Sequence, residues 1–458
     1  MSLTRIGTAN MYDRTINNIA KQQSDLTSQM EHASAGKRVL RPSDDPVAAA
    51  QAERARTRLS RIDSDQRTLD AQTATIKYGE STLGEINAAV QEFRSLIVNA
   101  GNGAFNQTQR DTLVEQLQSL RSQILSYSNR KDSNGLPLFR GLDTESSSPF
   151  PAGTQGMQSG QTNVSEYTIT NSLDGALAFF SGKTGNGVLA VEQKAFNPNF
   201  DDSDLVANPP HPINNPEFIA NKGNAWADVG VIKDPATATA LVAPKQIQVA
   251  ITVDADGKAS YSLFEVDTSV SPQTAPDPAT AIPLTNIDGT PMLDDQGQPM
   301  KSAPYKSGDA IYASGMALTI TGEPKDGDSF FIKPSENMSI FDTLDQAIAT
   351  VKNNVNPDGS TNHGALAHGL AKSLSELDTQ LNRVSTVRGF AGDLLNQAER
   401  MGNTLLAQGE QMEAQRSAAE DIDMVAALSQ LKTQETAVSA ALQSYASIQK
   451  LSLFNYIN

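Results

Sequence analysis

Three short stretches of this sequence carry residue types that are found in catalytic or ligand sites. The first, Ser181–Thr184 (SGKT), is similar to the end of a phosphate-binding loop, in which backbone N–H groups and a lysine hold phosphate oxygens. That loop requires a glycine five residues before Gly182, and position 177 is a leucine. We therefore interpret the stretch as a surface turn rather than a nucleotide site.

The other two stretches contain possible metal ligands. Asp254-Ala-Asp-Gly257 opens like a calcium-binding loop, but its glycine is fourth where that loop places it sixth, and a lysine follows. His363 and His368 are five residues apart, so on a helix they diverge and form no zinc pair. A hairpin turn and two loop or surface histidines are the simpler interpretations. With only four histidines and no cysteine, the sequence predicts no enzyme activity, no cofactor and no metal site.

Composition excludes further classes of function. The 458 residues suggest two to four domains, the formal net charge is −16, and aromatic residues make up only 5%. Such an acidic chain argues against nucleic acid and anionic membrane surfaces as partners. The sequence contains no run of eighteen apolar residues, so no transmembrane helix is expected. The start of the sequence lacks the apolar segment of a secretory signal peptide, so we expect either a cytoplasmic protein or export by another signal.

Both ends of the chain have the heptad pattern of coiled-coil helices. The N-terminal seam is formed by residues at seven-residue spacing and by two intermediate positions: Tyr12, Ile19, Leu26, Ala33, Ile16 and Met30. The C-terminal seam is interrupted only by Glu435 and contains Met424, Leu428, Leu431, Val438, Leu442, Tyr445, Ile448 and Leu451. Isolated helices of this kind are marginal in water. We therefore expect the two to pair antiparallel and to use their remaining apolar surface for packing between molecules.

A helix-break-helix joint is predicted after the N-terminal helix. Gly36 stands where a glycine in the left-handed region would end that helix, and Pro42 disfavours helical geometry at the residue before it. Asp45 followed by Pro46 fits the N-cap and first position of a second helix. The expected joint thus runs from residue 34 to residue 46.

The rest of the chain indicates a nested architecture. Heptads predict a helix from Pro46 to Asn99, a second helix begins near Asn106, and helical patterns return at Ser339. Short alternating runs with many Gly, Pro and Asp residues fill the region between, which we call the insertion (residues 146–334). Two strand pairs are expected there, residues 247–253 with 261–266 and residues 317–321 with 329–332. The predicted fold class is α+β, a discontinuous bundle of long helices with an inserted β-rich domain. Its three expected domains are residues 1–42 with 416–458, residues 43–145 with 335–415, and residues 146–334.

The joint carries a resemblance to a known family. SAGKRVLRPSDDP is similar to the S-x-G-K-R-x-x-x-P-S-D-D-P stretch of the bacterial flagellin superfamily. The matching positions are Ser34, Gly36, Lys37, Arg38, Pro42, Ser43, Asp44, Asp45 and Pro46. The ends TRIGTANMYDRTINNIAKQQSDL and ALQSYASIQKLSLFNYIN, and the turn GLPLFRG, resemble the hook–filament junction branch of that superfamily.

The resemblance implies a structural role outside the cell. It implies type III export without a cleaved signal peptide, and assembly as a ring of copies between the first hook-associated protein and flagellin. It also implies terminal helices that line the inner tube and an export chaperone that holds the C-terminal helix. Two alternatives stay open: flagellin itself, or a flagellin-like protein whose insertion binds surface glycans or hydrolyses them.

Overall fold

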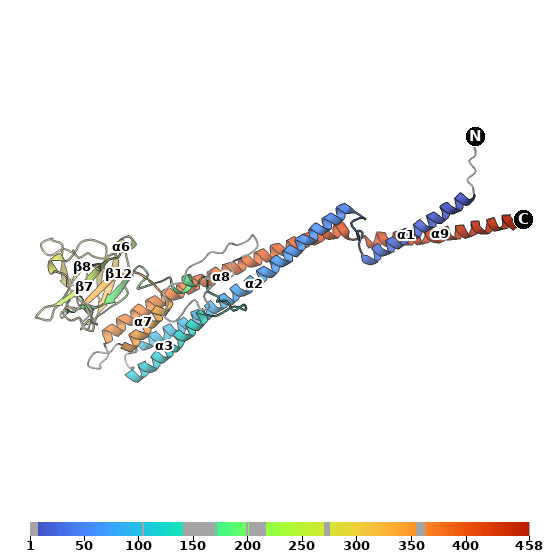
Figure 1. The fold of residues 1–458 in the computed structure, drawn as a ribbon. Helices are drawn as coiled ribbons and strands as arrows, with labels where there is room; N and C mark the ends of the chain where they lie inside the picture. Colours follow the sequence, from blue (N-terminus) through green and yellow to red (C-terminus); the bar gives the residue numbers. More distant parts are fainter. Residues whose placement is uncertain are drawn as a thin grey trace, which may run out of the picture. The chain divides into compact units, whose positions relative to one another are not determined.

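The computed structural model describes residues 8–102, 105–140, 169, 172–197, 200, 217–269, 275–353 and 362–457. The chain forms two compact units (Figure 1). The first unit contains residues 1–71, 166–168 and 397–458, and the second contains residues 72–165 and 169–396. No helix of the described residues is long and apolar enough to cross a membrane. Helical ends around a central β-rich region confirm the predicted fold class.

The first unit is helical. It contains α1 (Thr8–Ala35), the beginning of α2 (Pro46–Ala100), the end of α8 (His363–Glu420) and α9 (Met424–Ile457). α1 packs along α9, and the two lie side by side in Figure 1. The segment that follows α1 forms an antiparallel bridge to the segment that precedes α9, between Lys37 and Asp421. The two helices therefore run in opposite directions, which confirms the predicted pairing of the chain ends.

The second unit begins with a helical bundle. The rest of α2 and the first part of α8 belong to it, with α3 (Gln107–Ser128) and α7 (Ile340–Asn353) packed against each other. The predicted heptad positions of α2 are its core: Ile76, Leu83, Val90 and Ile97 are at most 1% exposed. α3 starts at an N-cap, where Asn106 and Gln109 each accept the other's backbone N–H. Local capping and the seven-residue repeat thus account for these helices.

The strands of the second unit form two main sheets. One has the order β2-β12-β7-β8-β9, and in the other β11 pairs with β10, β5 and β6. Buried apolar side chains from both sheets form one cluster, which includes Val249, Phe330, Ile311 and Leu318. The strands are β1 (Gly182–Lys183), β2 (Leu189–Gln193), β3 (Ala195–Phe196), β4 (Phe218–Ile219), β5 (Trp226–Ala227), β6 (Val231–Ile232), β7 (Lys245–Val253), β8 (Ala259–Asp267), β9 (Ser302–Pro304), β10 (Ala310–Ala313), β11 (Met316–Thr321), β12 (Ser329–Pro334) and β13 (Asn337–Met338). Short helical turns are α4 (Gly175–Phe179), α6 (Pro235–Ala240) and η1 (Pro278–Thr280).

One of the two predicted strand pairs is correct. β7 and β8 form the expected hairpin, in which Ile251 is opposite Tyr261. The predicted pairing of residues 317–321 with 329–332 is wrong, because β11 and β12 belong to different sheets. The connection between them is held by the buried Asp328, whose carboxylate accepts the backbone N–H groups of Lys222, Gly223 and Lys325. The bonds from Lys222 and Gly223 span more than a hundred residues, so strand alternation alone could not indicate them.

Candidate assembly site

The joint between α1 and α2 has the backbone geometry that its sequence predicts. Gly36 has a φ of +68° and ends α1, and the Lys37 N–H donates to the carbonyl of His32 at 3.1 Å. The chain then pairs with the α8–α9 connection: Arg38 N donates to Glu420 O at 2.7 Å, and Ile422 N donates to Gly36 O at 3.1 Å. The helix break after α1 and the helix break before α9 are therefore hydrogen-bonded to each other.

The two aspartates of the joint satisfy backbone donors on either side of the bend. Asp44 Oδ2 accepts the N–H groups of Leu40 and Arg41 at 3.0 and 2.8 Å. Asp45 Oδ1 accepts those of Val47 and Ala48 at 3.1 and 3.0 Å and so caps α2. The bond from Ala48, followed by that from Arg38, lowers the pKa of Asp45, and the bond from Arg41 lowers the pKa of Asp44. Both carboxylates therefore remain ionised when they hold the turn.

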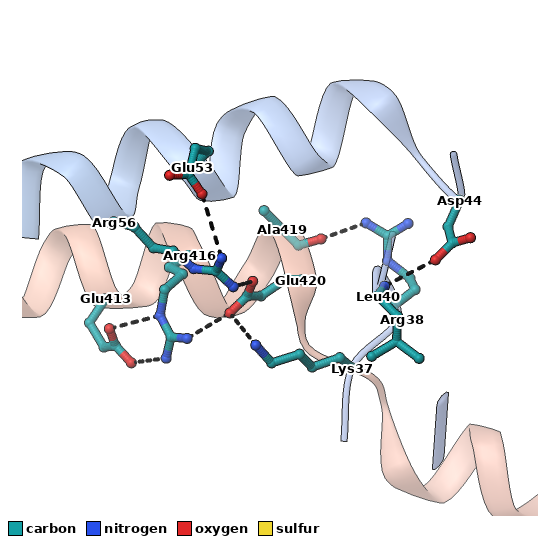
Figure 2. Close-up of polar contacts among 10 residues, drawn as sticks. All are labelled: Lys37, Arg38, Leu40, Asp44, Glu53, Arg56, Glu413, Arg416, Ala419 and Glu420. Carbon is teal, nitrogen blue, oxygen red and sulfur yellow. Dashed lines mark hydrogen bonds and ion pairs between the residues drawn. The ribbon is translucent and has the colours of Figure 1, made fainter. Parts of the chain in front are cut away.

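Glu420, the last residue of α8, is the electrostatic centre of the joint. Its side chain is only 3% exposed, and it contacts three cations from different segments, as Figure 2 shows. Lys37 Nζ lies 3.3 Å from one carboxylate oxygen, Arg416 Nη1 lies 2.6 Å from the same oxygen, and Arg56 binds the other oxygen. A buried carboxylate requires such partners because it has lost its hydration. Glu420 thereby ties the joint to both α2 and α8.

The remaining motif residues have simpler environments. Arg38 bonds Asp45 at 3.1 Å and the carbonyl of Ala419 at 2.8 Å. Ser34, Pro42 and Ser43 are exposed, and Pro46 is the first residue of α2. The sequence analysis did not identify Glu420, Arg56 or Arg416. The sequence signal that could have indicated Glu420 was a glutamate after two alanines, directly before the break between α8 and α9.

The packed faces of α1 and α9 differ in part from the predicted seams. Partly buried positions recur at alternating spacings of four and three: Thr15, Ile19, Gln22, Leu26 and Gln29 on α1, and Ala427, Leu431, Gln434, Val438, Ala441 and Tyr445 on α9. Half of the predicted seam therefore lies in the contact. Ile16 and Met30 on α1, and Met424, Leu428 and Leu442 on α9, lie outside the contact and are 42–54% exposed, so their predicted role in packing between molecules stays a prediction. A pair of helices covers only one narrow strip of each. The side chains of Ile448 and Leu451 lie outside the described residues.

The contact between α1 and α9 contains buried glutamines beside its apolar side chains, and further apolar side chains are exposed outside it. The Oε1 atoms of Gln22, Gln29 and Gln434 are buried and have no hydrogen-bond partner among the described residues. We call the exposed apolar side chains the outer stripe: Ile16, Met30, Met424, Val425, Leu428 and Leu442. Unsatisfied buried amides weaken the contact, and the outer stripe leaves apolar surface in water. The pair therefore leaves apolar side chains available for contacts with other molecules.

The stretches first considered for chemistry occupy other places. Gly182 and Thr184 are buried, and β1 pairs with β13, so the interpretation of Ser181–Thr184 as a surface turn is wrong. The hairpin turn at Asp254–Gly257 is confirmed by its position between β7 and β8. His363 is exposed at the start of α8. His368 is buried, contrary to prediction, and its Nδ1 lies 2.8 Å from the carbonyl of Ala227, while burial lowers its pKa.

Both ends of the chain match models of one protein family. The bacterial flagellin N-terminal helical region matches residues 6–144, and the bacterial flagellin C-terminal helical region matches residues 374–457. The chain belongs to the bacterial flagellin superfamily. The joint and the α1–α9 pair lie within these two regions, whereas most of the β-rich structure lies outside both.

Similar proteins within the flagellin superfamily include hook-associated proteins and flagellins. The chain is 35% identical to flagellar hook-associated protein 3 of Salmonella typhimurium over 184 residues, 40% of this chain and 55% of the relative. It is 32% identical to that of Escherichia coli over 186 residues, 40% and 56% of the two chains. Flagellin of Bacillus subtilis is 28% identical over 129 residues, 28% and 42% of the two chains. The chain spans about half the length of the curated relatives it matches.

Solved structures share the fold. Flagellar hook-associated protein 3 of Legionella pneumophila gives a TM-score of 0.59 at 22% identity, over 79% of this chain and 97% of that one. The FlgL crystal structure from Xanthomonas campestris gives 0.57 at 17% identity, over 80% and 99% of the two chains. This superfamily member therefore has the fold of those proteins over most of its length.

Proposed function

We propose that this protein is a structural adaptor of the bacterial flagellum that joins the hook to the filament. In this role it contacts the first hook-associated protein on one side and flagellin on the other. The likeness to hook-associated protein 3 supports the adaptor over flagellin, since it has higher identity over a longer stretch than the likeness to Bacillus subtilis flagellin. The proposed role is mechanical, without catalysis or a cofactor.

The outer stripe is the observation that carries this proposal. Its side chains lie on two helices from opposite ends of the chain, and each is at least 42% exposed. Covering the remaining surface of one such side chain contributes roughly 1 kcal/mol, so six of them favour association substantially. Neighbouring subunits of a ring provide that cover by head-to-tail contacts. An adaptor that acts through contacts alone needs such a surface.

The same residues define the proposed assembly interface. Ile16, Met30, Met424, Leu428 and Leu442 face neighbouring copies or the adjacent flagellar proteins, with Ile448 and Leu451 further along α9. Ile19, Leu26, Leu431, Val438 and Tyr445 hold the pair together beneath them. Before export, a chaperone covers α9 and prevents premature association. Export uses the type III route, and the final location is the extracellular hook–filament junction. Nucleic acid and membranes are not partners.

The three-part organisation fits this role. We propose that residues 1–42 with 416–458 make the inner contacts, that residues 43–145 with 335–415 form a bundle, and that the insertion lies outermost. The Glu420 cluster joins the first part to the second, since Lys37 and Glu420 belong to the first and Arg56 belongs to the second.

Electron microscopy of cells that lack the gene tests the proposal. We expect hooks without filaments and flagellin shed into the medium, both restored by the intact gene. Normal filaments in the deletion strain would contradict the adaptor role. Filaments formed by the purified chain alone would instead identify it as a flagellin.

A further inference from the structure

A pocket of about 400 Å³ opens in the insertion between the two sheets' edges. Three tyrosines line it, Tyr261 from β8, Tyr305 after β9 and Tyr312 from β10. Ile287 and Met292 contribute apolar side chains on another side, and Ile287 is 57% exposed at its position. The pocket lies entirely between the two matched family regions, so the adaptor role does not account for it.

The pocket contains polar groups that the described fold does not use. Tyr261 is only 9% exposed, yet its hydroxyl has no hydrogen bond to any residue that the structure describes. Burial, together with the negative charge of Asp309, raises its pKa. The Asp309 carboxylate is 64% exposed, and its closest charged partner is Lys306 Nζ at 3.9 Å. A hydroxyl donor, a carboxylate and an ammonium group are therefore available together.

The walls that surround these groups are held in place. The Tyr305 hydroxyl lies 3.2 Å from the carbonyl oxygen of Ile320 and 2.9 Å from that of Gly322. Opposite, backbone bonds of 2.8–2.9 Å connect Leu284, Met292 and Met300 in a closed triangle. This triangle fixes the turn that carries Ile287. A pocket with fixed walls binds a ligand with less loss of conformational entropy.

We propose that this pocket binds a neutral saccharide unit. A sugar ring has apolar C–H faces, which pack on aromatic rings, and an equator of hydroxyl groups. Those hydroxyls can donate to the Asp309 carboxylate and accept from Lys306 and from the Tyr261 hydroxyl. One acidic and one basic group balance each other, which favours a neutral ligand over a charged one. The size and mixed lining of the pocket are typical of small-molecule sites.

Ligand-observed NMR on the whole protein tests this inference. The probes are glucose, galactose, mannose, N-acetylglucosamine and N-acetylgalactosamine at millimolar concentration. We expect saturation transfer to at least one of them. Asp309→Asn and Tyr261→Phe should each weaken binding at least fivefold, because each removes a group that bonds the sugar. Asp256→Asn, the same charge change at the exposed β7–β8 turn, should bind as the unaltered protein does.

Asp309 is exposed, so Asp309→Asn separates ligand contact from folding, and circular dichroism verifies the fold of Tyr261→Phe. Saturation transfer from none of the five sugars would overturn the inference. Equal binding by Asp309→Asn and the unaltered protein would also overturn it. Tighter binding of glucuronic acid than of glucose would overturn the neutral ligand class. None of these outcomes bears on the adaptor role, which is tested in cells.

Discussion

Lys37 and Glu420 come from opposite ends of the chain, and the lysine Nζ lies 3.3 Å from the buried glutamate carboxylate. This contact makes one joint out of two helix breaks that are separated by almost the whole sequence. Arg56 and Arg416 bind the same carboxylate. The three cations around this one carboxylate hold the segment after α1, the start of α2 and the end of α8 together.

Removal of the Glu420 charge should destabilise the joint. In Glu420→Gln, Lys37, Arg56 and Arg416 lose their shared partner, and we expect a loss of about 2–3 kcal/mol, below the full cost for a wholly buried pair because the cations are partly exposed. The first thermal unfolding transition, followed by circular dichroism, measures this loss. Glu410→Gln, at an exposed site on the same helix, should leave that transition unchanged. Equal effects of the two changes would refute the role of Glu420.

A charge in the outer stripe should block assembly without unfolding the protein. Leu442 is 51% exposed, so Leu442→Asp should change monomer stability by no more than about 0.5 kcal/mol. Because the aspartate cannot be buried against a neighbouring subunit, complementation with this variant should give hooks without filaments. Ser444→Asp introduces the same charge at an exposed polar position and should support filaments. Normal motility with Leu442→Asp would remove Leu442 from the interface.

Local sequence signals were sufficient to predict the joint after α1, but not to predict Glu420, which binds it. Gly36 and Asp45 act on backbone groups within a few residues, so their types and order already predicted a helix end and a helix cap. Glu420 acts through tertiary contacts, and no local pattern marks the cations that surround it. The heptads likewise predicted the fold class and the long helices, because periodicity is also a local property of the sequence.

The helix faces show a different limit. A heptad pattern identified the apolar side of α1, but that side is wider than one contact. The pattern could not tell that Gln22 and Thr15 face α9 while Ile16 faces outward. The sheets show the same limit, because alternation predicted both β11 and β12 as strands but contained no information about which sheet each joins or about the contact of Asp328 with Lys222.

Replacing a seam glutamine by leucine should stabilise the terminal pair. Gln434 Oε1 is buried without a hydrogen-bond partner among the described residues, so Gln434→Leu removes that cost and adds apolar contact. We expect a gain of about 1 kcal/mol, measured as slower hydrogen exchange of the amides in α1 and α9. Gln430→Leu, at an exposed position of α9, is the matched control and should give no protection. If both variants exchange at the same rate as the unaltered protein, the glutamine does not weaken the contact.

The insertion should lose stability in acid through Glu192. Burial opposes ionisation of this carboxylate, but hydrogen bonds and charge from Lys333 and Lys194 outweigh burial and lower its pKa to about 2. A pKa lowered by folding stabilises the fold above the ordinary value near 4.5, and this contribution disappears as pH falls from there to 2. The loss amounts to about 3 kcal/mol. Denaturant titrations from pH 7 to pH 2 measure it through the fluorescence of Trp226, the single tryptophan, which lies in β5.

Glu376 changes the stability of the fold with pH in the opposite direction, so its effect can be distinguished from that of Glu192. Burial raises the pKa of Glu376 despite the nearby Lys372, so the ionised form of Glu376 destabilises the fold at high pH. Protonation relieves this cost as the pH falls to the ordinary glutamate value, and Glu376 contributes no further change below it. Glu192→Gln should therefore be less stable at pH 7 and should show little further loss between pH 4.5 and pH 2. Glu323→Gln, an exposed carboxylate of the same insertion, should follow the unaltered protein across the whole range. An acid loss in Glu192→Gln equal to that of the unaltered protein would show that another carboxylate controls the transition.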